Sequence, residues 1–295
     1  MDFSHVWKVL ILAIVQGAAE LLPVSSSAHV AVVSRLIGYD KASSPFEWAF
    51  LIVMLHTGTM FSVLFYFWAR WKPLFKYLPM LLAATVATGA LGYGLKLLIE
   101  RYLLDYEHHQ KIESLFQNFP LIAAALFVVG IIIIAAGTKE ARSPGKIESL
   151  SWAHALIVGV VQGICLPFRG FSRSGATIST GMFLGIARMR AEEFSFALAV
   201  LLTPAVIVYE AREMVKVHQE ISAATDGACE SIVSDVGHLF VPGLLGMVFS
   251  FLAGLFALRL LSAWMERGHW RWFGYYCLAA AAVVLVLHFV LPAVV

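Results

Sequence analysis

The chain has 295 residues, of which 60% are hydrophobic and only 14% are charged, and its mean hydropathy is +0.81. This balance lies far outside the range of soluble domains and is typical of an integral membrane protein. A net charge of +2, spread over several short loops, excludes nucleic acid as a partner. Three cysteines without a CxxC spacing support neither a disulfide framework nor a metal site.

The first 22 residues hold an apolar stretch followed by small residues, which is also the pattern of a cleaved signal peptide. Gln16 and Glu20 lie four residues apart in this segment and therefore share one face of a helix. Pro23 then interrupts the segment, because proline ends a helix and biases the preceding residue away from helical geometry. The polar residues of the arm that follows are Ser25, Ser26, Ser27 and His29.

Six segments are predicted to cross the membrane as helices. Four of them are long and apolar throughout, and two are shorter or richer in glycine. In chain order the six are 48–68, 77–98, 119–137, 194–209, 239–261 and 273–293.

An internal repeat relates the two halves of the chain. The sequence ILAIVQGAAELLPVSSSAH at 11–29 is echoed by ALIVGVVQGICLPFRGFSRSG at 155–175, and Gln162 follows Gln16 by 146 residues. The other pairs at this offset are Glu47 with Glu193 and Thr57 with Thr203. Several features at one offset predict a repeat within a single membrane domain, with one copy at about 1–148 and the other at about 149–295. A segment repeated in mid-chain is not a cleaved signal, so the N-terminal segment belongs to the fold.

The repeat predicts an all-α membrane fold of inverted topology. Each copy holds one polar, proline-interrupted segment followed by three full spans. If the polar segment is a re-entrant helix hairpin, three spans turn the second copy upside down relative to the first, as in many transporter folds. The hairpin tips then meet near the midplane, where irregular backbone is tolerated only inside protein or beside water.

The distribution of basic residues predicts the orientation. Three short loops are rich in lysine and arginine and are expected in the cytoplasm, which leaves both termini and the loops at 99–118 and 212–238 outside. The basic residues of these loops are Arg70, Lys72 and Lys76, then Lys139, Arg142 and Lys146, then Arg267 and Arg271.

The second polar segment has the composition of a phosphate site. In the stretch RGFSRSGAT at 169–177, Arg173 and Thr177 share a helix face, and Ser172 and Ser174 lie at the helix start. Free backbone N–H groups, hydroxyl donors and an arginine together form an anion site with a preference for phosphate.

Glu20 and Arg173 are the hardest residues to explain as ordinary structure. A charge at membrane depth costs about 2.5 to 3.5 kcal/mol on insertion scales, so it is expected to be paired or functional. A purely structural Glu20–Arg173 ion pair is one alternative, but that pair alone would not require His29, Gln16 and a ring of hydroxyl groups. Together these groups offer donors for phosphate oxygens, a carboxylate for a cation, a hydroxyl nucleophile and a base.

Other polar residues have structural explanations. The serine clusters could act only as helix N-caps, and Arg169 could extend to the membrane interface. His56 is expected to be a hydrogen-bonded core histidine. Glu47 and Glu193 each open an apolar helix, where we expect them to face water and to suit the helix dipole.

The two motifs carry a family resemblance. The first reads QGAAELLPVSSSAH at 16–29 and the second reads RGFSRSGAT at 169–177. They resemble the (E/Q)xxxE segment with PVSSSGH, and the PGxSRSxxT motif, of the bacitracin-resistance type of undecaprenyl diphosphate phosphatase, an integral membrane family. The likeness continues through ISTGMFLGIARMRAEEFSFALAV to most of the chain. Ala28 replaces the motif's glycine and Arg169 replaces its proline, so the role of Arg169 stays open.

The resemblance implies hydrolysis of the terminal phosphate of undecaprenyl diphosphate, which recycles the lipid carrier for cell-wall synthesis. The site would face the extracytoplasmic side of the bacterial plasma (inner) membrane. By motif position, Gln16 and Glu20 would hold a divalent cation, Mg²⁺ or Ca²⁺. Ser26 or a bound water would attack, His29 would move the proton, and Arg173 would bind and neutralise the diphosphate. The remaining substrate-binding residues would be Ser25, Ser27, Ser172, Ser174 and Thr177.

A second function stays open at this point. Inverted repeats with paired hairpins are also a transporter plan, so a transporter or flippase for polyprenyl phosphate is the alternative. The partners expected from the sequence are the polyprenyl diphosphate lipid, the membrane bilayer and a second copy of the chain in a homodimer.

Overall fold

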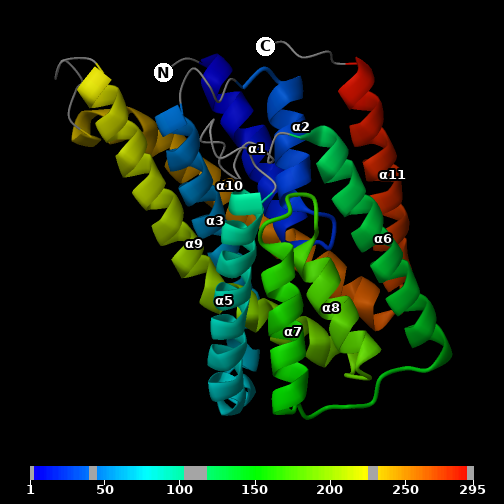
Figure 1. The fold of residues 1–295 in the computed structure, drawn as a ribbon. Coiled ribbons are helices and arrows are strands. Elements are labelled where there is room, and N and C mark those ends of the chain that lie inside the picture. The colour runs from blue at the N-terminus through cyan, green and yellow to red at the C-terminus, as the bar shows by residue number, and fades with distance from the viewer. Residues whose placement is uncertain (1–2, 40–44, 103–117, 225–231, 291–295) are drawn as a thin grey trace.

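The computed structural model describes residues 3–39, 45–102, 118–224 and 232–290, and within them helices form the whole framework (Figure 1). The described residues contain no strand, only one isolated bridge between Ile147 and Ile186. The helices are α1 (Phe3–Leu21), α2 (Ser26–Leu36), α3 (Pro45–Tyr66), α4 (Trp71–Leu74), α5 (Leu78–Tyr102), α6 (Phe119–Arg142), α7 (Trp152–Cys165), α8 (Arg173–Phe183), α9 (Arg188–Ala224), α10 (Ile232–Glu266) and α11 (Trp270–Val290).

Six of the described stretches are long and apolar enough to cross a membrane, so the predicted spans and the all-α membrane class are confirmed. The protein is therefore a multi-pass membrane protein. The six stretches are Phe46–Tyr66, Trp68–Tyr102, Phe119–Arg142, Arg188–Lys216, Leu239–Glu266 and Trp270–Val290.

Local sequence explains the beginnings of α6 and α7 and the basic residues at the end of α6. Asn118 caps α6, since its side-chain oxygen accepts a hydrogen bond from Leu121 N at 3.0 Å. Ser151 caps α7 in a capping box with His154. Lys139 and Arg142 lie in the last turn of α6, where positive charge suits the negative end of the helix dipole.

The two polar segments form helix pairs that meet inside the molecule. The pair α1–α2 occupies the upper half of Figure 1 and the pair α7–α8 the lower half, and the turns of the two pairs face each other between them. Pro23 and Pro167 each lie two residues after the end of the first helix of a pair, α1 ending at Leu21 and α7 at Cys165. The predicted hairpins are therefore present, whereas the symmetry that would relate the two halves stays a prediction.

Each hairpin packs against a helix from the other half of the chain. The first arm α1 packs mainly on α10, and the first arm α7 packs mainly on α5. Glycines make both contacts close: a Cβ at Gly17 would clash with the carbonyl oxygen of Ser250, and a Cβ at Gly163 would lie 2.9 Å from that of Thr88. Gly163 follows Gly17 by the repeat offset of 146 residues. The two halves thus hold one another through matching positions.

Two expectations about the ends of the spans are wrong. The segment 212–238 is not a loop, because α9 continues to Ala224 and α10 begins at Ile232. Glu193 does not face water, because it is buried and paired, with Arg190 Nη1 at 2.8 Å and Arg70 Nη1 at 3.6 Å. Arg190 in the first turn of α9 and Arg70 in the short helix that follows α3 offset the cost of burying this carboxylate.

Candidate active site

The centre of the site is an ion pair between the two hairpins. Arg173 Nη2 at the start of α8 donates to Glu20 Oε1 at the end of α1, over 2.7 Å. The side chains are only 20% and 16% exposed, respectively, so both charges lie largely inside the protein. Residues 153 positions apart are thereby joined where the two turns meet.

The second oxygen of the carboxylate binds neighbours from the first hairpin. Ser26 Oγ donates to Glu20 Oε2 at 2.5 Å, and Gln16 Nε2 donates to the same oxygen at 3.2 Å. Gln16 reaches Glu20 because residues four apart share a helix face, and Ser26 reaches it because the turn brings the start of α2 back beside α1. The carboxylate thus receives hydrogen bonds from an arginine, a hydroxyl and an amide.

The turn of the first hairpin has unusual backbone geometry at Ser25. This residue has a φ of 69°, the left-handed region that few residues other than glycine adopt, and its side chain does not cap α2. Its hydroxyl lies 3.3 Å from that of Ser27. Ser27 Oγ in turn accepts a hydrogen bond from Gly170 N of the second hairpin at 3.3 Å. Backbone strain of this kind concentrates at functional sites.

Hydroxyl groups of the second hairpin stabilise the start of α8. Ser172 is its N-cap, since Oγ accepts from Gly175 N at 3.2 Å. Ser174 Oγ donates to Leu22 O of the first hairpin at 3.3 Å. Thr177 is buried, and its hydroxyl lies 2.8 Å from Arg173 O and 2.6 Å from Ser195 Oγ of α9. The structure thus brings Ser172 and Ser174 to the meeting point of the turns, while Thr177 bonds toward α9.

His29 is joined to the site only through the first turn. Its Nδ1 lies 2.7 Å from Ser25 O, and its Nε2 lies 2.7 Å from the hydroxyl of Tyr276 on α11, whose ring stacks on the imidazole. A carbonyl oxygen only accepts, so Nδ1 carries a proton, and in the neutral ring Nε2 accepts the tyrosine proton. Among the described residues, no hydrogen bond joins His29 to Glu20 or Ser26.

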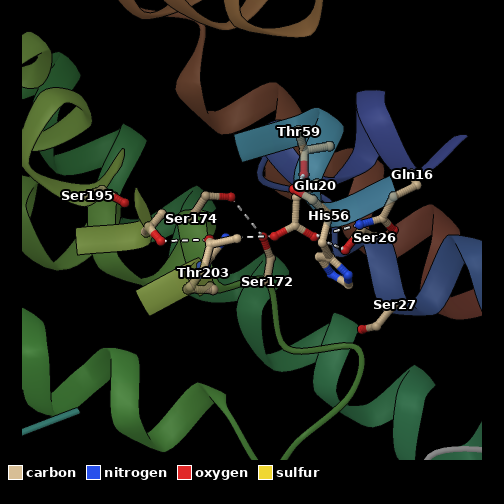
Figure 2. A network of polar contacts seen from close by, with 12 residues as sticks. Gln16, Glu20, Ser26, Ser27, His56, Thr59, Ser172, Ser174, Ser195 and Thr203 are labelled. Carbon is tan, nitrogen blue, oxygen red and sulfur yellow. Dashed lines mark hydrogen bonds and ion pairs between the residues drawn. The ribbon is translucent and has the colours of Figure 1, made fainter. Parts of the chain in front are cut away.

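Another histidine lies beside the carboxylate instead. Figure 2 shows His56 and Thr59 of α3, with Ser195 and Thr203 of α9, in the same polar network as Glu20. The sequence predicted none of these four as site residues. The repeat gave one signal, because Thr203 falls on Thr57 at the common offset, but nothing in the sequence places α3 and α9 against the first turn.

The donors around Glu20 fit a cation that is held mainly by a substrate. No group of three or more His, Cys, Asp or Glu side chains gathers within the described residues. Mg²⁺ commonly takes one or two carboxylates together with phosphate oxygens of the substrate and water. Glu20 supplies one carboxylate, and Gln16 keeps an amide oxygen after its NH₂ group has bonded to Glu20. This donor set suits a cation bound with a diphosphate and not a closed protein cage.

Chemically, the site is built for an anion close to a carboxylate. One N–H group of Arg173 donates to Glu20, and the planar guanidinium has further N–H groups. The first N–H groups of α8 add donors and the positive end of a helix dipole. A phosphate at the turns would therefore meet donors from both hairpins.

Comparisons with known proteins agree along almost the whole chain. A family described as bacitracin resistance protein BacA matches residues 9–283. The undecaprenyl-diphosphatase 2 of Acinetobacter baylyi is 50% identical over 295 aligned residues, which cover 97% of this chain and 98% of that protein. The undecaprenyl-diphosphatase of Idiomarina loihiensis is 31% identical, covering 98% of this chain and 100% of that protein. That of Rhodopirellula baltica is 30% identical, with coverages of 95% and 97%.

Proposed function

The chain belongs to the bacitracin resistance protein BacA family, and on that premise we propose that it hydrolyses undecaprenyl diphosphate to undecaprenyl phosphate and inorganic phosphate. The structural observation that carries the proposal is the contact of Glu20 with Arg173 at the meeting of the two turns. In this site the Arg173 guanidinium, which can bind phosphate, lies beside the Glu20 carboxylate, which also contacts the Ser26 hydroxyl group. The whole arrangement lies inside a membrane protein. A lipid diphosphate is a substrate that can reach such a site without leaving the bilayer.

Arg173 is the principal phosphate ligand in this proposal. Its guanidinium is always charged and matches two phosphate oxygens in one plane. Because it is already held by Glu20, it is oriented before the substrate arrives. Ser172, Ser174 and the N–H groups that begin α8 complete the cradle, and Ser25, Ser27 and Thr177 support it through the bonds described above.

Ser26 or a bound water attacks the terminal phosphorus. If Ser26 attacks, undecaprenyl phosphate leaves, and water then hydrolyses the phosphoserine to release inorganic phosphate. Ser26 Oγ gives its proton to the hydrogen bond with Glu20, which leaves oxygen lone pairs for the phosphate. With water as the nucleophile, the new P–O bond forms as the bond to the bridging oxygen breaks, and the water proton passes to a base of the site. We assign that transfer to His29, whose Nε2 takes the proton in exchange for the hydrogen bond from the Tyr276 hydroxyl.

A divalent cation, Mg²⁺ or Ca²⁺, is part of the proposal, with Glu20 and Gln16 as its protein ligands. When bound, the cation would neutralise charge on the phosphate oxygens and on the leaving group. The donor set described above supports this role.

The proposal places the site on the extracytoplasmic side of the bacterial inner membrane. The support is the basic composition of the loops that join α3 to α5, α6 to α7 and α10 to α11, because such loops stay in the cytoplasm. No relative reported above is named for transport, so we do not retain the flippase alternative. The homodimer stays a prediction, which light scattering of the purified protein tests.

The deciding experiment is phosphate release from undecaprenyl diphosphate by the purified protein, with and without a chelator. We expect release that the chelator abolishes, and loss of release in Arg173→Ala and Glu20→Ala. Thr138→Val is a matched control, because within the part of the chain that the structure describes the Thr138 hydroxyl bonds only to Ile134 O of α6. Full release in both site variants would contradict the site, and no release by any form would contradict the function.

A further inference from the structure

His56 is a polar residue of the site to which neither sequence motif assigns a role. It lies in the middle of α3, between apolar turns, and its side chain is 21% exposed. Figure 2 shows its imidazole in the polar network that contains Glu20 and Ser26. His56 also interacts electrostatically with Glu20, so the charge on each group affects the other.

The Nδ1 atom of the imidazole lies beside two oxygen atoms. Nδ1 lies 3.1 Å from Ile52 O on the preceding turn of α3 and 3.3 Å from Glu210 Oε2 on α9. Ile52 O accepts the hydrogen bond, so Nδ1 carries a proton, and the Glu210 carboxylate contacts the same nitrogen as an ion pair. Nε2 makes no hydrogen bond in the part of the chain that the structure describes.

Glu210 explains why the imidazole is held so firmly. Its Oε2 is buried and accepts no hydrogen bond from the described residues, so the nearby imidazole is what offsets its charge. A carboxylate that orients a histidine through one ring nitrogen leaves the other nitrogen for a ligand.

We propose that His56 is a further catalytic residue: its imidazolium, paired with Glu210 through Nδ1–H, donates from Nε2–H to a phosphate oxygen of the bound diphosphate. This inference rests on the proposed function. The contact adds a donor from α3 to the donors of the two hairpins. The diphosphate is therefore bound by α3, by the first hairpin and by the second hairpin. His56 makes and breaks no bond itself; it stabilises the charge of the phosphate group throughout the reaction.

Two substitutions at one position test the contact. His56→Gln keeps an N–H donor near the position of Nε2, whereas His56→Leu keeps the volume and removes the donor. For His56→Leu we expect kcat/KM to fall about tenfold or more, as for the loss of a hydrogen bond to a charged group. His56→Gln should retain most of the wild-type kcat/KM. Thr57→Val is the control on the same helix, because among the described residues the Thr57 hydroxyl bonds only to Val53 O.

Inorganic phosphate provides a second readout, because it tests the phosphate contact with a ligand that has no polyprenyl chain. Phosphate as a product inhibitor should bind at least about tenfold more weakly to His56→Leu than to the wild type, and about as tightly to His56→Gln. The thermal midpoints of the variants show whether each one folds. Equal kcat/KM and equal phosphate inhibition in wild type and a folded His56→Leu would overturn the inference. Because the wild type is measured in the same assay, that result differs from failure of the proposed function, in which the wild type itself is inactive.

Discussion

At the scale of single residues, the bond between Glu20 and Arg173 has both a structural and a chemical role. Removing one partner leaves the other charge largely buried, which typically costs about 3–5 kcal/mol. We therefore expect Glu20→Gln and Arg173→Gln each to lower the thermal midpoint and to abolish phosphate release. The double variant leaves neither charge and should recover much of the midpoint, but no activity.

This cycle separates a structural ion pair from a catalytic site. Thermal unfolding in detergent and phosphate release are measured on the four proteins side by side. If the double variant regained activity together with stability, the pair would be structural only, which is the alternative left open by the sequence.

Tyr276 is a positioning residue for His29. It bonds to His29 Nε2 at 2.7 Å and stacks on the ring, so it fixes the orientation of the imidazole. Tyr276→Phe should lower kcat by up to about tenfold with little change in KM, in keeping with a neutral hydrogen bond of about 0.5–1.5 kcal/mol. The measurement is steady-state kinetics. Tyr275→Phe, at the preceding position of α11, is the control.

A double-mutant cycle shows whether Tyr276 acts through the histidine. In a His29→Ala background, Tyr276→Phe should have no further effect on kcat, because the group that it positions is gone. Equal losses of kcat in both backgrounds would mean that the tyrosine acts independently of His29.

The residue scale also shows what the sequence could predict of the site. Glu20 and Arg173 stand out because a charge at membrane depth needs a partner, and the structure does bring them together. His56 does not stand out, because its partner Glu210 lies on a helix 154 residues further along the chain. Contacts of that kind depend on how α3 and α9 pack, which no local pattern records.

At the scale of the elements, glycine allows each hairpin to approach a helix of the other half. Gly17→Ala would place a methyl group against the backbone of α10, and Gly163→Ala would place one against α5. We expect each substitution to destabilise the protein by about 1–3 kcal/mol, the usual cost of overpacking. A lower thermal midpoint in detergent measures this effect.

Gly89 of α5 is the matched control, since a Cβ added there meets no atom within 4 Å. Gly89→Ala should keep the wild-type midpoint or raise it slightly, because alanine favours the helix. If all three alanine variants were equally stable, the close contacts of α1 and α7 would not be needed for the fold.

Helix positions were predictable where hydropathy decides them, and helix lengths were not. The apolar runs locate all six spans, and proline locates the turns after α1 and α7. In α9, however, the helix passes through Pro204 and continues to Ala224. Neighbouring helices can satisfy the backbone group that proline frees, and this compensation is not visible in the sequence of α9 itself.

At the scale of the whole molecule, the orientation in the membrane can be tested directly. In a cysteine-free background, Ser143→Cys, in the basic loop after α6, should resist an impermeant maleimide added to spheroplasts. Gln219→Cys, at an exposed position near the end of α9, should react. Permeabilised spheroplasts label both positions and show that each cysteine is reactive, and the reverse pattern in intact spheroplasts would overturn the orientation.

The reciprocal packing of α1 on α10 and of α7 on α5 has a consequence for synthesis in the cell. The first hairpin leaves the ribosome early, but its packing partner begins only at Ile232 and the ion partner of Glu20 only at Arg173. Until then Glu20 has hydrogen-bond partners in Gln16 and Ser26 of its own hairpin, but no cation. A chain that ends before Arg173 thus carries the Glu20 carboxylate in the membrane without the arginine that pairs with it in the complete protein.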